Sequence, residues 1–146
     1  MPLRVLKTRA FSRAARKEGL TDQTLCAAVA EIEAGLIDAR LGGSLLKKRV
    51  AKGSRGKSGG FRTIAAYRQH DRLVFLYVFA KNERDNITEQ ELVALSEIGD
   101  EYMRLSLNKL DELVAKGTLI EVVCDANEQE DKPNSRRGPR GRARSP

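Results

Sequence analysis

Residues 61–80 read FRTIAAYRQHDRLVFLYVFA, and this stretch decides the fold. Its first part, Phe61–Arg68, has the composition of a β-strand, and residues 69–72 are polar enough for a turn. Residues 73–80 form a continuous apolar run with aromatic and β-branched side chains, which is typical of a strand buried on both faces. The stretch therefore predicts two strands joined by a tight turn, with the second strand at the centre of a sheet.

Helix signals lie upstream of these strands. Residues 10–18 are rich in Ala and Arg and stop at Gly19, and Thr21 is placed to cap a second helix that ends at Gly35. That second helix carries apolar residues at helical spacing, namely Leu25, Val29 and Ile32. Residues 4–7 alternate polar and apolar side chains, which predicts a short first strand. The two helices form a predicted antiparallel hairpin.

The remaining segments extend the pattern on both sides. A strand is expected around residues 45–50, followed by a Gly-rich loop at 53–60. Thr88 and Glu91 form a capping-box pattern for a helix that we expect to break near Gly99. A further helical piece ends at Gly117 and leads into a short strand or extended arm at 118–124. We predict a domain over residues 1–125 and a basic, disordered tail over 126–146.

Charge is distributed unevenly along the chain, whose net charge is +7. Residues 40–84 hold 12 basic and 2 acidic side chains, whereas residues 85–131 hold 3 basic and 13 acidic ones. The basic block indicates a surface that meets phosphates, although neutralisation by the acidic block within the fold is the alternative. Residues 51–58 fit a permissive P-loop pattern, but a strand follows where a helix is needed, which argues against nucleotide hydrolysis.

Several site classes are disfavoured by the inventory of reactive residues. Two cysteines, Cys26 and Cys124, and one histidine, His70, are too few for a standard structural zinc site, and we expect no metal or cofactor. Without an export signal or a membrane-spanning run, the chain is expected to be cytoplasmic, with both cysteines reduced. His70 falls in the predicted turn and is expected to be a surface residue rather than a general base.

Two motifs resemble a known family. The string at residues 56–64, GKSGGFRTI, is followed by an apolar strand that runs into residues 79–87, FAKNERDNI. This order and spacing resemble the RelE/HigB-like toxins of bacterial type II toxin–antitoxin systems, within the RelE/ParE superfamily. The resemblance implies an α+β fold, with a small antiparallel sheet, two N-terminal helices packed on it and a C-terminal helix. It also implies a metal-independent endoribonuclease that cleaves mRNA on the ribosome, inhibits translation and is neutralised by a small antitoxin protein.

The resemblance suggests roles for the cations of the basic block. RNA cleavage through the 2′-hydroxyl needs a base, an acid and positive charge around the phosphorane. Arg62 is the candidate for stabilising that charge, Lys57 for phosphate contact or proton transfer, and Lys81 and Arg84 for completing the site. The candidates for holding the RNA backbone are Lys47, Lys48, Arg49, Lys52 and Arg55. Tyr67 and Tyr77 are weak candidates for the acid.

Two other functions fit the same fold. The first is a ParE-type toxin, which inhibits DNA gyrase without catalysis. The second is an inactive relative that binds RNA or a partner through its basic face. A full set of phosphate-directed cations at the loop and strand ends favours the ribonuclease.

Overall fold

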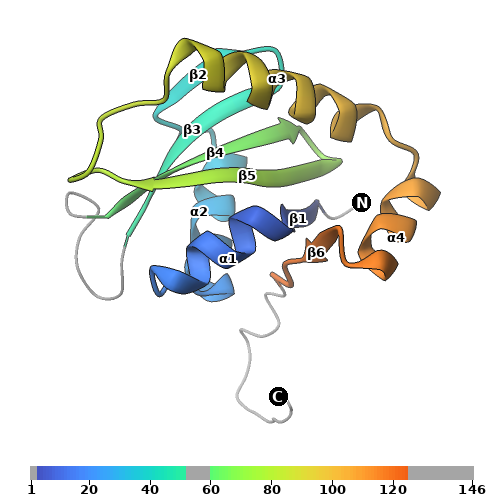
Figure 1. The fold of residues 1–146 in the computed structure, drawn as a ribbon. Helices are drawn as coiled ribbons and strands as arrows, with labels where there is room; N and C mark the ends of the chain where they lie inside the picture. Colours follow the sequence, from blue (N-terminus) through green and yellow to red (C-terminus); the bar gives the residue numbers. More distant parts are fainter. Residues whose placement is uncertain (1–2, 52–59, 125–146) are drawn as a thin grey trace, which may run out of the picture.

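The computed structural model describes residues 3–51 and 60–124, and it forms a six-stranded sheet with helices on both faces (Figure 1). In chain order the elements are β1 (Arg4–Thr8), α1 (Arg9–Lys17), α2 (Asp22–Glu33), β2 (Ala39–Gly42), β3 (Leu45–Val50), β4 (Phe61–Arg68), β5 (Arg72–Ala80), α3 (Glu89–Arg104), α4 (Leu107–Lys116) and β6 (Leu119–Glu121). The α+β class is confirmed. The predicted tail, 126–146, lies outside the described residues.

The sheet corrects the predicted topology in two ways. Its strand order is β2-β3-β4-β5-β1-β6, and β1 runs parallel to β5 while every other pair is antiparallel. The chain starts with a strand, as residues 4–7 predict, before the two helices that the resemblance places at the N-terminus, and the sheet is mixed rather than antiparallel. The reason is that β1 inserts between β5 and β6, where both of its edges are paired.

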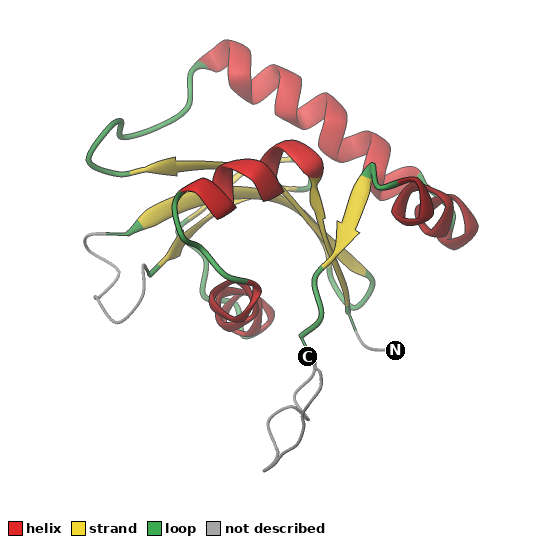
Figure 2. Ribbon diagram, turned by 60° about the horizontal axis from the view of Figure 1, so that its bottom comes forward, coloured by secondary structure: helices red, strands yellow, loops and turns green. Residues whose placement is uncertain are grey.

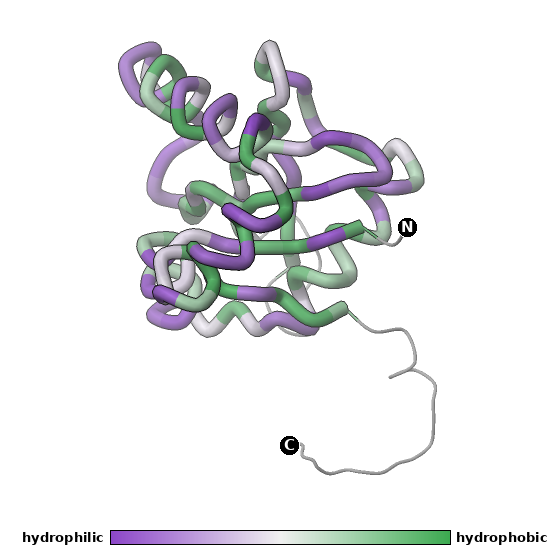
Figure 3. The backbone as a smooth tube through the Cα atoms, turned by 90° about the vertical axis from the view of Figure 1, so that its right-hand side faces the viewer, coloured by the Kyte–Doolittle hydropathy of each residue, from purple (hydrophilic) through white to green (hydrophobic). Residues whose placement is uncertain are grey.

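The helices lie on both sides of the sheet (Figure 2), and the buried apolar residues form two clusters. On one face, α1 and α2 pack against the sheet around Phe11, Leu25 and Phe75. On the other face, α3 and α4 cover a second cluster that includes Ile64 and Leu110. α3, near the top of Figure 3, alternates between hydrophilic and hydrophobic segments, as expected for a helix with one apolar face.

The helix starts agree with the sequence. Thr21 caps α2, and its hydroxyl accepts a hydrogen bond from the N–H of Thr24 at 3.2 Å. Thr88 and Glu91 form the predicted capping box at the start of α3. Each cap satisfies backbone N–H groups that the first helical turn leaves without a partner.

The predicted break near Gly99 is wrong, because α3 runs without interruption from Glu89 to Arg104. Gly99 is buried, and a Cβ atom built there would lie 3.1 Å from both the Ala66 Cβ and the Leu45 Cδ2. The glycine lets α3 approach the sheet closely instead of ending the helix. The two helical pieces separate at Leu105 and Ser106.

The two cysteines also differ from the expectation. Cys26 on α2 and Cys124 after β6 form a disulfide bond, although they are 98 residues apart in the sequence. They were expected to be reduced thiols. The pairing follows from the fold, since the segment after β6 turns over the α2 side of the sheet and Val122 is buried in the core that α1 and α2 share.

Candidate phosphate-binding face

Three of the candidate cations share one face of the sheet. Side chains alternate along a strand, so Lys47 and Arg49 of β3 point to the same side. Arg62 of β4 is the register partner of Arg49, and Ile64, which packs in the α3 cluster, is the partner of Lys47. These cations therefore lie on the face that α3 covers, at the end where β3 stops and β4 begins.

Arg62 is the central residue of this face. The whole residue is only 7% exposed, and its Nε lies 3.7 Å from Asp38 Oδ2. The Nε of Arg49 lies at the same distance from the same oxygen. The Nη1 of Arg62 is buried and has no hydrogen-bond partner among the residues that the structure describes.

One carboxylate is thus shared by two guanidinium groups. The three side chains of Asp38, Arg49 and Arg62 carry a net charge of +1. A buried guanidinium nitrogen without a partner is costly, and an oxyanion would satisfy it. This arrangement can accept a phosphate group.

Arg84 lies beside this group but is held by an acidic partner. Its guanidinium donates to the Glu91 carboxylate at 2.6 and 3.1 Å and to the Tyr77 hydroxyl at 3.2 Å. It also lies over the Phe79 ring, 5.5 Å from the ring centre, and Phe79 is the register partner of Arg62. Arg84 is therefore neutralised, and it shapes the wall of the site.

Proton affinities in this cluster follow from the same contacts. Burial is the main cause that raises the pKa of Tyr77, with the Glu91 charge adding to it, so the hydroxyl is protonated at neutral pH. The hydrogen bonds from Arg84, and then from the Thr88 backbone, lower the pKa of Glu91 from 4.5 to about 2. At neutral pH Tyr77 is therefore protonated and donates a hydrogen bond to the Glu91 carboxylate at 3.3 Å, and Glu91 is an anion.

A pH dependence follows from the lowered pKa of Glu91. A carboxyl group whose folded pKa is depressed adds stability above its unfolded pKa and loses it as the pH falls through the folded value. The difference in melting temperature between wild type and Glu91→Gln should stay constant down to pH 4.5 and shrink as the pH approaches about 2. Thermal unfolding measured across this range checks it, and a difference that vanishes above pH 4.5 contradicts it.

The other sequence candidates fall in different places. Lys48 is 3% exposed and points to the opposite face, where its Nζ pairs with Glu31 at 2.6 Å and donates to the Leu36 carbonyl at 2.8 Å. It stabilises the packing of α2, so we leave it out of the site. Lys81 is exposed directly after β5, and its N–H donates to the Gly60 carbonyl at 3.4 Å, which places it beside the start of β4.

Three candidates, Lys52, Arg55 and Lys57, lie outside the described residues. They belong to the segment that joins β3 to β4, whose two ends flank the face that carries Arg62. Of the two candidate tyrosines, Tyr67 packs on the α1 and α2 side, whereas Tyr77 is on the site face. Of the two, only Tyr77 lies on the same face as Arg62, so Tyr77 is the candidate for the acid.

A comparison of the sequence with the profiles of known protein families shows to which family the chain belongs. The sequence profile described as "RelE toxin of RelE / RelB toxin-antitoxin system" matches residues 3–122, which is most of the chain. The chain belongs to the RelE toxin family. No curated protein matches the chain significantly. The RelE toxin is accordingly one component of a toxin–antitoxin system and has an antitoxin as its partner.

Two residues of this RelE toxin were missed as site candidates by sequence reasoning. Asp38 precedes β2 and bridges Arg49 and Arg62, and Glu91 was recognised only as half of a capping box. The excess of basic residues in the 40–84 block was the available signal, because a buried cation needs a counter-ion. The sequence alone does not show which carboxylate supplies it.

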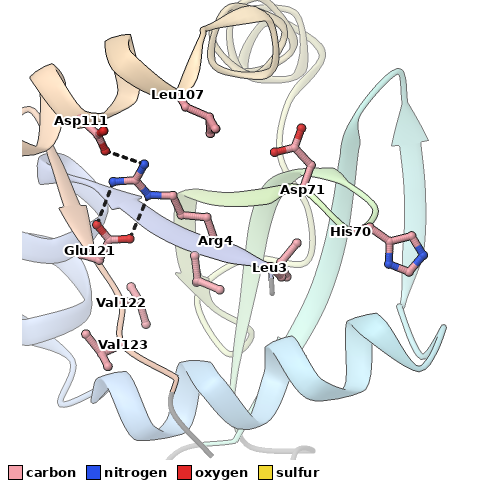
Figure 4. Close-up of a pocket in the computed structure, with 10 residues that line it drawn as sticks. Leu3, Arg4, His70, Asp71, Leu107, Asp111, Glu121, Val122 and Val123 are labelled. Atoms are coloured by element: carbon pink, nitrogen blue, oxygen red, sulfur yellow. Dashed lines mark hydrogen bonds and ion pairs between the residues drawn. The ribbon is translucent and has the colours of Figure 1, made fainter. Parts of the chain in front are cut away.

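A cavity of about 770 Å³ lies at the other end of the RelE toxin's sheet (Figure 4). Inside it, Arg4 of β1 pairs with Asp111 at 2.8 Å and with Glu121 at 3.1 Å, so its charge is neutralised. His70 lies across the cavity from these pairs, exposed in the turn between β4 and β5 as predicted. The cavity is therefore a poor candidate for the phosphate site.

Within residues 3–51 and 60–124, no cluster of His, Cys, Asp or Glu is suited to hold a metal ion. In the same part of the chain, no helix has the length and apolar character needed to cross a bilayer.

Proposed function

We propose that this RelE toxin is a ribosome-dependent mRNA endonuclease that inhibits translation in the cytoplasm and is neutralised by its cognate antitoxin. The observation that carries the proposal is the Arg62 guanidinium, which is buried beside Arg49 and whose Nη1 has no hydrogen-bond partner within residues 3–51 and 60–124. The Asp38 carboxylate faces both of these cations. Such a group is suited to a phosphodiester whose negative charge increases in the transition state.

The proposed reaction is an attack of the RNA 2′-hydroxyl on the adjacent phosphorus. The bond from phosphorus to the 5′ oxygen breaks, leaving a 2′,3′-cyclic phosphate and a 5′-hydroxyl. Arg62 stabilises the phosphorane because a guanidinium binds two of its oxygens at once. Lys57 is our candidate for taking the 2′ proton, and Tyr77, protonated at neutral pH, is our candidate for protonating the leaving oxygen. This route needs no metal ion.

The remaining cations are proposed to hold the RNA backbone. Lys47 and Arg49 flank Arg62 on the same face, and Lys81 follows β5 at the same end of the sheet. Lys52 and Arg55, in the segment between β3 and β4, are proposed to act with them. Contacts of this kind add affinity without sequence preference and weaken as the salt concentration rises.

The proposal is tested in a bacterial translation extract. Purified toxin is added, and the ends of a defined mRNA are mapped with and without loaded ribosomes. We expect cuts within the translated region only when ribosomes are loaded, and none after the antitoxin is added. An intact mRNA together with inhibited gyrase supercoiling would favour the ParE-type function, and bound but uncut RNA would favour an inactive relative.

A further inference from the structure

We propose that Glu91 is a positioning residue of the RNA-cleaving site, whose carboxylate fixes the Arg84 guanidinium against Tyr77 and Phe79. The inference rests on the proposed function. In this role, the first turn of α3 fixes the side chains of Arg84, Tyr77 and Phe79 next to Arg62.

Four groups constrain the Arg84 side chain. Glu91 receives two of its hydrogen bonds, one on each carboxylate oxygen, at 2.6 and 3.1 Å. The Nε donates to the Asn86 carbonyl at 2.9 Å, and Nη1 also donates to the Tyr77 hydroxyl at 3.2 Å. The fourth group is the Phe79 ring, over which the guanidinium lies. A two-pronged ion pair of this type fixes orientation as well as position.

The same carboxylate also caps α3. Glu91 Oε1 accepts from the Thr88 N–H at 2.7 Å, and the Thr88 hydroxyl accepts from the Glu91 N–H at 3.1 Å. A capping box requires only an acceptor at this position, and glutamine supplies one equally well. The hydrogen bonding of the cap therefore does not need the negative charge of Glu91, whereas the ion pair with Arg84 does.

The link to the reaction runs through Phe79. This residue is 6% exposed and is paired in register with Arg62 on the neighbouring strand. Without the Glu91 charge, Arg84 becomes a free cation at the edge of the site. RNA then binds more tightly, but Tyr77 and the wall of the site lose their fixed geometry. Small displacements of a reacting group reduce rates strongly.

Two variants separate the charge from the cap. Glu91→Gln keeps an acceptor for the cap and removes the charge, while Thr88→Ala removes the cap hydroxyl and keeps the pair with Arg84. We expect single-turnover cleavage of ribosome-bound mRNA by Glu91→Gln to be slower by about tenfold at saturating toxin. Its half-saturating concentration should fall by about twofold, because a negative charge is lost from an RNA-binding face.

The control and a further readout complete the test. Thr88→Ala should melt a few degrees lower than wild type but cleave within about twofold of the wild-type rate. The NMR signals of the Arg84 Nη–H groups, which donate to Glu91, should exchange with water faster in Glu91→Gln and remain protected in Thr88→Ala. This readout does not depend on cleavage.

The outcomes are distinguishable. If wild type cleaves mRNA and Glu91→Gln cleaves at the same rate, the positioning role is overturned and the proposed function stands. Equal losses of rate in Glu91→Gln and Thr88→Ala also overturn the positioning role, because the effect then comes from the helix start. If wild type leaves mRNA intact, the proposed function fails and takes the positioning role with it, while the NMR signal still reports the Arg84 contact.

Discussion

Arg62→Ala should reduce the cleavage of ribosome-bound mRNA by roughly 10²- to 10³-fold, the usual cost of removing one donor to a transition-state oxyanion. The reason is the position of Arg62, which is buried on β4 beside Arg49 and whose Nη1 has no hydrogen-bond partner in the part of the chain that the structure describes. Arg62→Lys should also be strongly impaired. A lysine ammonium is a point charge and cannot donate two parallel hydrogen bonds to a phosphate.

Single-turnover cleavage rates at saturating toxin measure this effect. Arg13→Ala is the matched control, since it also removes one positive charge but lies exposed on α1, on the other face of the sheet. The control should cleave at the wild-type rate. Wild-type cleavage by Arg62→Ala, in a variant whose circular dichroism spectrum is native, would remove Arg62 from the mechanism.

Loss of the disulfide should have the largest effect on stability. Cys26–Cys124 closes a loop over a sequence separation of 98 residues, and a cross-link of that length restricts the unfolded chain by about 4 kcal/mol. Cys26→Ser, or reduction with dithiothreitol, should therefore lower the melting temperature by roughly 15 °C. The structural consequence is release of the segment after β6 from α2.

The matched comparison for this prediction is Cys124→Ser. It should cause the same loss as Cys26→Ser, and the double substitution should add little, because the two residues act as one unit. The intact mass of the oxidised protein should be about 2 Da below that of the reduced protein, as expected for one disulfide. Equal melting temperatures with and without reductant would contradict the prediction.

The central strands were accessible from local sequence. Phe61–Arg68 forms β4 with the predicted bounds, and the apolar run at 73–80 lies within the buried strand β5. Thr21 and the Thr88–Glu91 pair mark the helix starts as predicted. These features depend on residues close together in the chain, where periodicity and capping chemistry are readable.

Long-range pairing was not accessible in the same way. The parallel pairing of β1 with β5 and the bond between Cys26 and Cys124 join segments far apart in the sequence. Within the site, Lys47, Lys48 and Arg49 are consecutive cations, and only the strand register shows that Lys48 faces α2. A shift of one residue would exchange the two faces.

The Asp38 contact has a similar origin. Asp38 is distant in sequence from Arg62, and the hairpin of β2 and β3 brings the two together, with the Asp38 N–H donating to the Lys47 carbonyl at 2.9 Å. The β2 strand itself was not predicted, because its four residues, ARLG, are short and include a glycine. Asp38 could therefore be identified as the counter-ion of the site only from the three-dimensional structure.

One measurement tests the proposed reaction most directly. Toxin is added to ribosomes loaded with an all-ribose mRNA, or with the same mRNA carrying a single 2′-deoxy nucleotide on the 5′ side of the mapped cut. We expect the all-ribose mRNA to be cut so that the downstream fragment carries a 5′-hydroxyl, and the 2′-deoxy mRNA to stay intact at that position. An uncut all-ribose mRNA, or equal cutting of both substrates, would contradict it.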